Sequence, residues 1–143
     1  ASSRMLQATL DGDTKTMAEI LQFAHDTETP LFNYNNETDL TAIVNLVYLA
    51  ARDNYYVERE EKAGRGYADF IFYPEHPGDD GLILELKVDD TPEAAIQQIR
   101  ERKYALKFQG KMAEKKRHTG RILLVGIGYS KKDKEHCCIV EAY

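Results

Sequence analysis

Two stretches of the chain, GYADFIFYP (residues 66–74) and GLILELKV (residues 81–88), carry charged residues inside apolar, strand-like runs. Charged side chains usually avoid such positions. The first run contains an acid, Asp69, and the second contains an acid-x-base pair, Glu85 and Lys87. Two carboxylates that converge can hold Mg²⁺, and a lysine beside them can hold a water or a phosphate oxygen. These residue types are the minimum that metal-assisted phosphodiester hydrolysis requires.

The strand period places these three residues relative to one another. Side chains alternate between the faces of a strand, so Glu85 and Lys87 project side by side from residues 82–88. If this strand pairs as a hairpin with residues 67–74, Asp69 can approach Glu85. The alternative is a cross-strand salt bridge on a solvent-exposed face, worth under about 1 kcal/mol. The pattern alone leaves both interpretations open, because E-x-K is common in charged chains.

The hydrophobic pattern outward from these strands is helical before residue 53 and alternating after it. Short turns with Gly, Pro and Asp join the first three strands, which predicts an antiparallel meander. Thr91-Pro92 is a strong helix start, and the helix that follows makes the next crossover parallel and right-handed. The expected elements are helices 5–24 and 37–52, strands 55–60, 67–74 and 82–88, a helix from 92 to about 109 ending at Gly110, and strands 121–129 and 136–143.

Length and composition bound the class of protein. With 143 residues, 43% of them apolar and 30% charged, the chain is expected to be one soluble, globular domain, residues 1–143. No apolar run approaches the roughly 20 residues of a membrane helix, and the start lacks a signal-peptide core. The missing initiator Met suggests an excised or tagged fragment. The two adjacent cysteines indicate no disulfide scaffold, which favours a cytoplasmic location.

The charge distribution is uneven although the net charge is −5. Residues 100–118 hold eight lysines and arginines against two acids, so this segment is +6 and the remainder is −11. Such a segment could contact phosphates, or it could be a solvated helix and loop, and the sequence leaves both open. The candidate phosphate contacts are Arg100, Lys103, Lys107 and Lys111, together with Arg65 in the turn before residue 67.

Two helical residues are further candidates. Glu37 lies on the apolar stripe of its helix, three residues before Leu40, so it is either a third metal-site carboxylate or an acid stabilised by the helix dipole. Gln98 lies beside the stripe that Ala95, Ile99 and Leu106 form in the later helix, with Tyr104 about two turns on. The glycines of GIG (126–128) lack phosphate-loop spacing. The four histidines are scattered, and no Ser/His/Asp arrangement stands out.

The segments GRGYADFIFYP, LILELK and AAIQQIRERKYA together resemble the PD-(D/E)XK nuclease superfamily. The similarity covers nearly the whole chain, from about Met5 to Tyr143. It is closest to the nuclease-like domains found C-terminal to AAA-ATPase-like domains in bacteria. The E-x-K strand combined with a downstream Q-I-x-x-x-x-Y helix is fairly specific. The resemblance implies an α/β, restriction-endonuclease-like fold with an αβββαβ core and a mixed central sheet flanked by helices, to which helices 5–25 are an addition.

The resemblance also implies roles for individual residues. Asp69 and Glu85 match the acidic metal ligands, and Lys87 matches the lysine that orients or activates the attacking water. Glu37 matches an acid that some members carry on the first core helix. The supporting residues on the later helix are Gln98 and Tyr104, and the backbone carbonyl of Leu86 is a further expected ligand. The chain departs from the family pattern at Ala68, where proline is usual, and it lacks a Walker motif.

The expected function is therefore a Mg²⁺- or Mn²⁺-dependent nuclease acting on phosphodiester bonds, with DNA as the substrate and little sequence preference. The alternative is a non-catalytic module that keeps the nuclease fold and binds nucleic acid or a protein. A hydrolase of RNA or of another phosphate ester is a third interpretation. The expected partners are nucleic acid, a fused or separate ATPase domain and a second copy of the chain, with no membrane.

Overall fold

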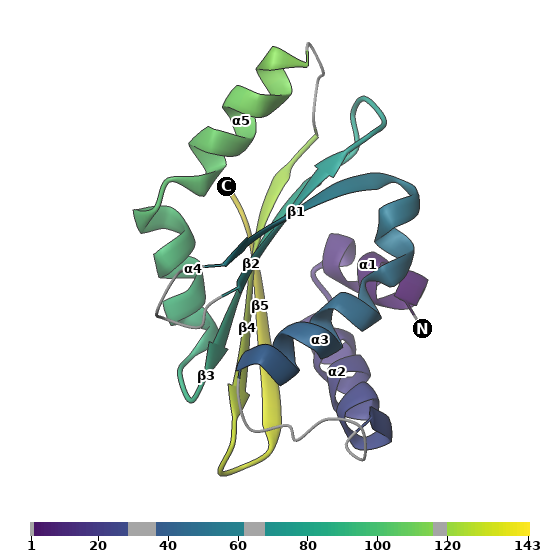
Figure 1. Ribbon diagram of the computed structural model, residues 1–143, viewed down its shortest axis with the longest axis vertical. Helices are drawn as coiled ribbons and strands as arrows, with labels where there is room; N and C mark the ends of the chain where they lie inside the picture. Colours follow the sequence, from purple (N-terminus) through teal and green to yellow (C-terminus); the bar gives the residue numbers. More distant parts are fainter. Residues whose placement is uncertain (1, 29–36, 62–67, 116–119) are drawn as a thin grey trace.

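A mixed five-stranded sheet with helices on both faces forms the centre of the protein (Figure 1). The computed structural model describes residues 2–28, 37–61, 68–115 and 120–143. Their elements in chain order are α1 (Ser2–Asp11), α2 (Thr14–Glu28), α3 (Glu37–Val47), the 3-10 helix η1 (Leu49–Asp53), β1 (Tyr55–Glu61), β2 (Ala68–Pro74), β3 (Gly81–Val88), α4 (Pro92–Glu101), α5 (Tyr104–Glu114), β4 (Ile122–Ser130) and β5 (Glu135–Ala142).

The strands lie in the sheet in the order in which they occur along the chain. β1, β2 and β3 pair antiparallel, which confirms the predicted meander. β3 pairs parallel with β4, and β5 then adds antiparallel to β4. The parallel pair requires the long crossover through α4 and α5. The structure therefore confirms the expected α/β fold with a mixed central sheet.

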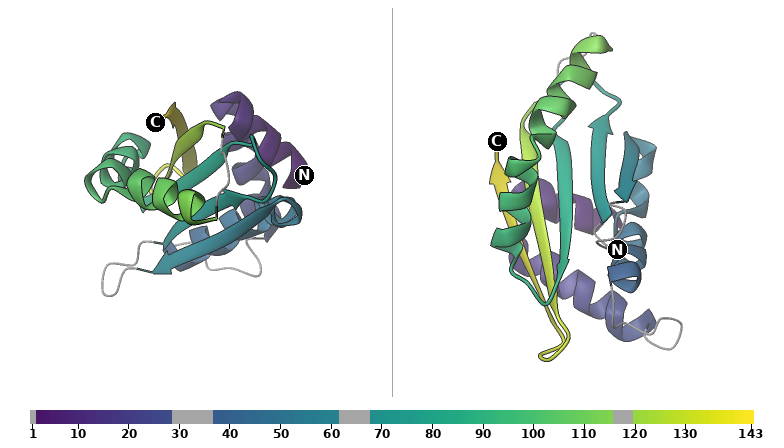
Figure 2. Two further views of the ribbon diagram at one scale, coloured as in Figure 1. Left: turned by 90° about the horizontal axis from the view of Figure 1, so that it is seen from above. Right: turned by 60° about the vertical axis from the view of Figure 1, so that its left-hand side comes forward.

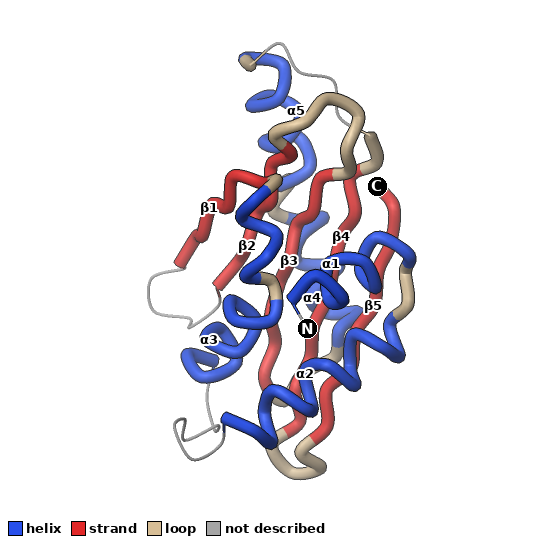
Figure 3. Tube along the Cα trace, turned by 90° about the vertical axis from the view of Figure 1, so that its right-hand side faces the viewer, coloured by secondary structure: helices blue, strands red, loops and turns tan. Residues whose placement is uncertain are grey.

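Each face of the sheet belongs to a separate apolar core. Phe70, Leu84 and Leu86 pack with α1, α2 and α3 on one face. Ile71 and Ile83, which alternate with them, pack with α4 and α5 on the other. The views in Figure 2 and Figure 3 show α1, α2 and α3 together on one side and α4 and α5 on the opposite side. Both faces of the central strands are therefore covered.

The helical region predicted over residues 5–24 is confirmed as helical, but two helices rather than one occupy it. α1 ends at Asp11, and Gly12 adopts a left-handed conformation with φ of +70°. Glycine takes up such a conformation without steric cost, which is why helices often end at it. Asp13 then caps α2, since its side chain accepts hydrogen bonds from the backbone nitrogen and the hydroxyl of Thr16 at 3.2 and 2.6 Å.

The helix predicted from 92 to about 109 is also two helices. The start is confirmed, because Thr91 caps α4 and accepts a hydrogen bond from the backbone nitrogen of Ala94 at 3.0 Å. The chain then breaks at Lys103, whose φ is +57°, and α5 continues through Gly110 to Glu114. Leu106, which a continuous helix would have placed on the apolar stripe, is 54% exposed.

The phase of the apolar residues explains this break. At about 100° per residue, the buried positions of α4 centre on Ala95 and Ile99. Those of α5 centre on Tyr104, Phe108 and Met112. In one straight helix these two stripes would lie on nearly opposite sides. Both can face the sheet only if the chain changes direction between them.

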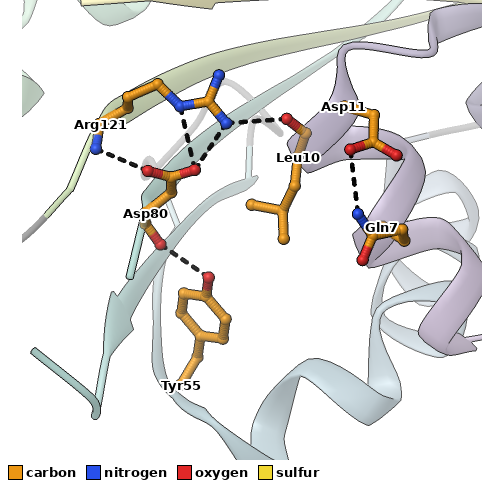
Figure 4. A network of polar contacts seen from close by, with 6 residues as sticks. All are labelled: Gln7, Leu10, Asp11, Tyr55, Asp80 and Arg121. Atoms are coloured by element: carbon orange, nitrogen blue, oxygen red, sulfur yellow. Dashed lines mark hydrogen bonds and ion pairs between the residues drawn. The ribbon is translucent and has the colours of Figure 1, made fainter. Parts of the chain in front are cut away.

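Polar contacts fasten α1 to the rest of the protein (Figure 4). The guanidinium of Arg121 donates to the carbonyl oxygen of Leu10 at 3.0 Å and to the carboxylate of Asp80 at 2.7 and 3.1 Å. The Asp80 carbonyl accepts from the hydroxyl of Tyr55 at 2.7 Å. The C-terminal end of α1 is thus linked to the residues that immediately precede β3 and β4.

Candidate active site

The backbone register brings Asp69 and Glu85 directly opposite each other. β2 and β3 pair with Asp69 across from Glu85, and Ile71 lies across from Ile83 two residues along. By strand alternation both acids lie on the sheet face that α4 and α5 cover. The predicted convergence of these two positions is therefore confirmed at the level of the backbone. The side chain of Asp69 lies outside the described part of the structure.

Glu85 and Lys87 are buried in the centre of the sheet. The side chain of Glu85 is 0% exposed and that of Lys87 is 6% exposed, and each has interaction partners. Charged groups are rarely buried without a partner because desolvation is costly. The solvent exposure that the salt-bridge alternative assumed is therefore contradicted at Glu85 and Lys87. Buried charged groups of this kind occur both in functional sites and in structural ion-pair networks.

Two glycines of β4 allow α4 to lie close to this pair. Gly126 is paired with Glu85, and Gly128 is paired with Lys87. A Cβ atom on Gly126 would collide with the carbonyl oxygen of Pro92, and one on Gly128 would lie 2.9 Å from the carbonyl oxygen of Asp90. The start of α4 therefore lies directly on the strand next to Glu85 and Lys87. The sequence had excluded a phosphate loop at these glycines but did not reveal this packing role.

We expect Gly126→Ala to destabilise the protein by about 1–3 kcal/mol, because the added methyl group would push α4 away from β4. Gly110→Ala is the matched control, since a Cβ there has nothing within 4 Å. In the interior of α5 this control should stabilise the protein by up to about 1 kcal/mol. Urea unfolding of the two variants measures both changes. Equal stability of the variants would contradict the close packing of α4.

The register also reveals an acid that the sequence analysis missed. Glu60 of β1 is paired with Asp69, which is paired with Glu85, so three acidic residues occupy one row across three strands. The alternation of YYVEREE places Glu60 on a definite face of its strand. Its position beside Asp69 becomes clear only from the pairing of β1 with β2. The side chain of Glu60 lies outside the described part. Among the described side chains, no three potential metal ligands gather.

The supporting residues lie on the same side of the sheet as Glu85. Gln98 is partly buried on α4. Tyr104, the first residue of α5, is 8% exposed and packs in the core that contains Ile71 and Ile83. They are therefore on consecutive helices rather than two turns apart on one helix.

The structure describes the two further predicted ligands, Glu37 and the carbonyl oxygen of Leu86, only through the elements that carry them. Glu37 is the first residue of α3, which packs on the opposite face of the sheet, and its side chain lies outside the described part. Leu86 follows Glu85 on β3, and its side chain is buried in the core on the α3 side. A metal-binding role for Glu37 and for the Leu86 carbonyl oxygen stays a prediction.

The basic segment is engaged in ion pairs within the protein. Arg100 contacts Glu141 at 2.9 Å, and Lys107 and Lys111 contact Glu58 at 3.2 and 2.6 Å. The hydrogen bond from Lys111 lowers the pKa of Glu58 and in turn raises the pKa of the lysine. Lys103 occupies the break between α4 and α5. Arg65 lies outside the described residues.

The mixed sheet, its crossover helices and an acid facing an E-x-K strand together define an α/β protein of the restriction-endonuclease-like class. The profile of the PD-(D/E)XK nuclease superfamily matches residues 36–137, so the chain belongs to this superfamily. No curated protein and no solved structure matches it significantly. Membership indicates a nuclease-type phosphodiesterase with a nucleic-acid substrate, and members generally use divalent metals such as Mg²⁺ or Mn²⁺. No helix in the described ranges is long and apolar enough to cross a membrane.

Proposed function

We propose that the protein is a metal-dependent nuclease that hydrolyses phosphodiester bonds in DNA. The observation that carries this proposal is the placement of Asp69 opposite the buried Glu85, with the buried Lys87 two residues further along the same strand face. The match to the nuclease superfamily supports it independently.

The residues present suit a hard divalent cation. Mg²⁺ and Mn²⁺ take oxygen ligands, and carboxylates are their usual protein donors. Like charges directly opposite one another destabilise a sheet, so a divalent cation beside the row of Glu60, Asp69 and Glu85 would stabilise it. We propose Asp69 and Glu85 as the principal ligands. The carbonyl oxygen of Leu86 and Glu37 are further candidate ligands, although α3, which carries Glu37, packs on the opposite face of the sheet.

The chemistry divides between the ion and the side chains around it. When bound, the ion supplies charge neutralisation and lowers the pKa of a coordinated water. Lys87 would hold the attacking water and the scissile phosphate oxygen in position by donating hydrogen bonds from its ammonium group. Gln98 and Tyr104 would act as positioning residues on the α4 and α5 side. Burial of Glu85 and Lys87 strengthens these electrostatic interactions, because the local dielectric is low.

The same proposal includes the DNA-contacting residues, the cellular location and the partners of the protein. Arg65, Arg100, Lys103, Lys107 and Lys111 would contact the DNA backbone, so affinity should fall as salt rises. The ion pairs of Arg100, Lys107 and Lys111 would exchange acidic partners for phosphates. The resemblance to nuclease-like domains that follow AAA-ATPase-like domains supports a bacterial, cytoplasmic protein. Its partners would be a fused or separate ATPase domain and a second copy of the chain.

A metal-binding measurement combined with a cleavage assay tests this function. Supercoiled plasmid should be nicked with Mg²⁺ or Mn²⁺ and left intact with EDTA. Titration calorimetry should show that Glu85→Gln weakens Mn²⁺ binding by at least about tenfold, because the substitution removes a ligand charge without changing side-chain size. Glu135→Gln is the matched control, since Glu135 is an exposed acid at the start of β5. It should bind the metal as the wild type does.

Two results would overturn the proposal. Equal metal affinity of the wild type, Glu85→Gln and Glu135→Gln would remove Glu85 from the site. A protein that retards DNA in gels but cuts none with either metal would be a binding module. Comparing plasmid, single-stranded DNA and RNA as substrates separates a deoxyribonuclease from a hydrolase of RNA.

A further inference from the structure

Three aromatic rings form a column that runs from the core to the outer strand of the sheet. The rings of Phe108 and Tyr73 stack with centroids 4.9 Å apart and an angle of 15° between their planes. Tyr56 continues the column at 6.2 Å and 28°. Phe108 is 0% exposed and Tyr73 is 1% exposed, whereas Tyr56 is 49% exposed. The column therefore begins in the core and ends in a ring that is half open to solvent.

Two lysines of α5 surround the outer end of this column. The Nζ atom of Lys111 lies 5.2 Å from the centre of the Tyr56 ring and 4.8 Å from that of Tyr73. The Nζ atom of Lys115 lies 5.2 Å from the Tyr56 ring. Tyr56 is on β1, the first strand of the sheet order, and Figure 3 shows β1 at one edge of the sheet. Among the described strands, none lies beyond β1.

The column lies on the same sheet face as the candidate active site. Tyr56 precedes Glu60 by four residues on β1, and Glu60 is paired with Asp69. At about 3.3 Å per residue the separation along the strand is about 13 Å. A few nucleotides span this distance. A strand of nucleic acid held at Asp69 and Glu85 could therefore pass beside Tyr56.

We infer that Tyr56 is a stacking position for an unpaired base of single-stranded DNA. Lys115 would contact a neighbouring phosphate, and Lys111, which is paired with Glu58 at 2.6 Å, would exchange this carboxylate for another phosphate. An aromatic ring between cations is how proteins bind single strands without reading sequence, because every base presents a flat face. In a duplex those faces are occupied by neighbouring base pairs, so the same ring offers duplex DNA little. The inference rests on the proposed function and specifies its substrate as DNA with an unpaired segment.

Binding measured in EDTA tests the inference without any cleavage. The fluorescence anisotropy of a labelled single-stranded oligonucleotide gives the affinity, and a blunt duplex of the same sequence is the comparison. Tyr56→Leu should weaken single-strand binding by between about 5-fold and 140-fold, the range that corresponds to one lost stacking interaction. Tyr56→Phe keeps the ring and should bind within about twofold of the wild type. Duplex affinity should be the same in all three proteins.

Phe23→Leu is the matched control, because Phe23 is 70% exposed on α2, which packs on the opposite face of the sheet. This variant should bind single strands as the wild type does. Equal single-strand affinity in Tyr56→Leu, or an equal loss for single strand and duplex, would overturn the inference. Tighter binding of a single-stranded RNA than of the DNA would also overturn it. A protein that binds single-stranded DNA as expected here but never cuts DNA would contradict only the proposal that it is a nuclease.

Discussion

Lys87→Met is expected to lower the rate of metal-dependent plasmid nicking by about 10²- to 10⁴-fold, the usual contribution of a positioned proton-transfer group. Methionine has a similar length but has no charge and no hydrogen to donate. The substitution therefore removes the contact with the attacking water and leaves both acidic ligands in place. Mn²⁺ affinity measured by calorimetry should stay within a few-fold of the wild type. This separation of turnover from metal binding distinguishes Lys87 from Glu85.

A second variant at this position tests the geometry. Lys87→Arg retains the charge, but the planar guanidinium is larger and cannot lose its proton in proteins. Because Lys87 is only 6% exposed, the larger group should also impair nicking. Thermal unfolding should confirm that both variants are folded. Nicking at the wild-type rate by folded Lys87→Met would remove Lys87 from the mechanism or reveal a contaminating nuclease.

His136 is expected to make the protein less stable in mild acid. The side chain on β5 is 7% exposed, and its ring lies 4.7 Å from that of Tyr129 and 5.6 Å from that of His25. Its Nδ1 atom is 3.0 Å from the side-chain oxygen of Gln22. Burial, and after it the neighbouring His25, lower the pKa of His136 to about 4, and Asp26 opposes the shift. Between the ordinary pKa of 6.5 and this value the unfolded chain therefore binds a proton at His136, whereas the folded protein keeps the ring neutral.

The sign of the effect follows from this difference. Between the unfolded pKa near 6.5 and the folded value of about 4, the unfolded state holds more protons, so stability falls as pH falls. From pH 7.5 to pH 5 this histidine should cost about 2 kcal/mol of unfolding free energy. Urea unfolding at these two pH values measures the loss. His136→Gln, which removes the titrating group, should reduce the difference, and an unchanged difference would contradict the assignment.

The strands and the central pair of the site could be predicted because they depend on local rules. Alternation places Asp69 and Glu85 on definite faces, and a short turn between their strands fixes the pairing. The burial of Glu85 and Lys87 could not be predicted in this way. It depends on α4 lying close to Gly126 and Gly128, which are about forty residues downstream. The sequence therefore could not decide whether Glu85 and Lys87 are exposed to solvent, and the fold shows that both are buried.

The sequence described residues 92–114 incompletely for two different reasons. The break at Lys103 was present in the sequence, since the apolar residues around Ile99 and Phe108 are out of phase in a single helix. The prediction of one apolar stripe through Leu106 did not account for this difference in phase. The ion pairs of Lys107 and Lys111 with Glu58 join residues about fifty positions apart. No local pattern indicates such contacts, so the sequence did not show that Lys107 and Lys111 have an acidic partner within the protein.

The attachment of α1 affects where the protein can be cut for study. Family similarity begins at residue 36, yet Met5, Met17 and Leu21 are fully buried in the same core as Leu84. The hydroxyl groups of Thr9 and Tyr48 lie 2.8 Å apart, and α2 packs against β5. A fragment trimmed to the boundaries of the family match would expose this core and would remove the Leu10 carbonyl oxygen that accepts from Arg121. The unit that shares one core is thus larger than the unit that sequence comparison delineates, and expression boundaries should include α1 and α2.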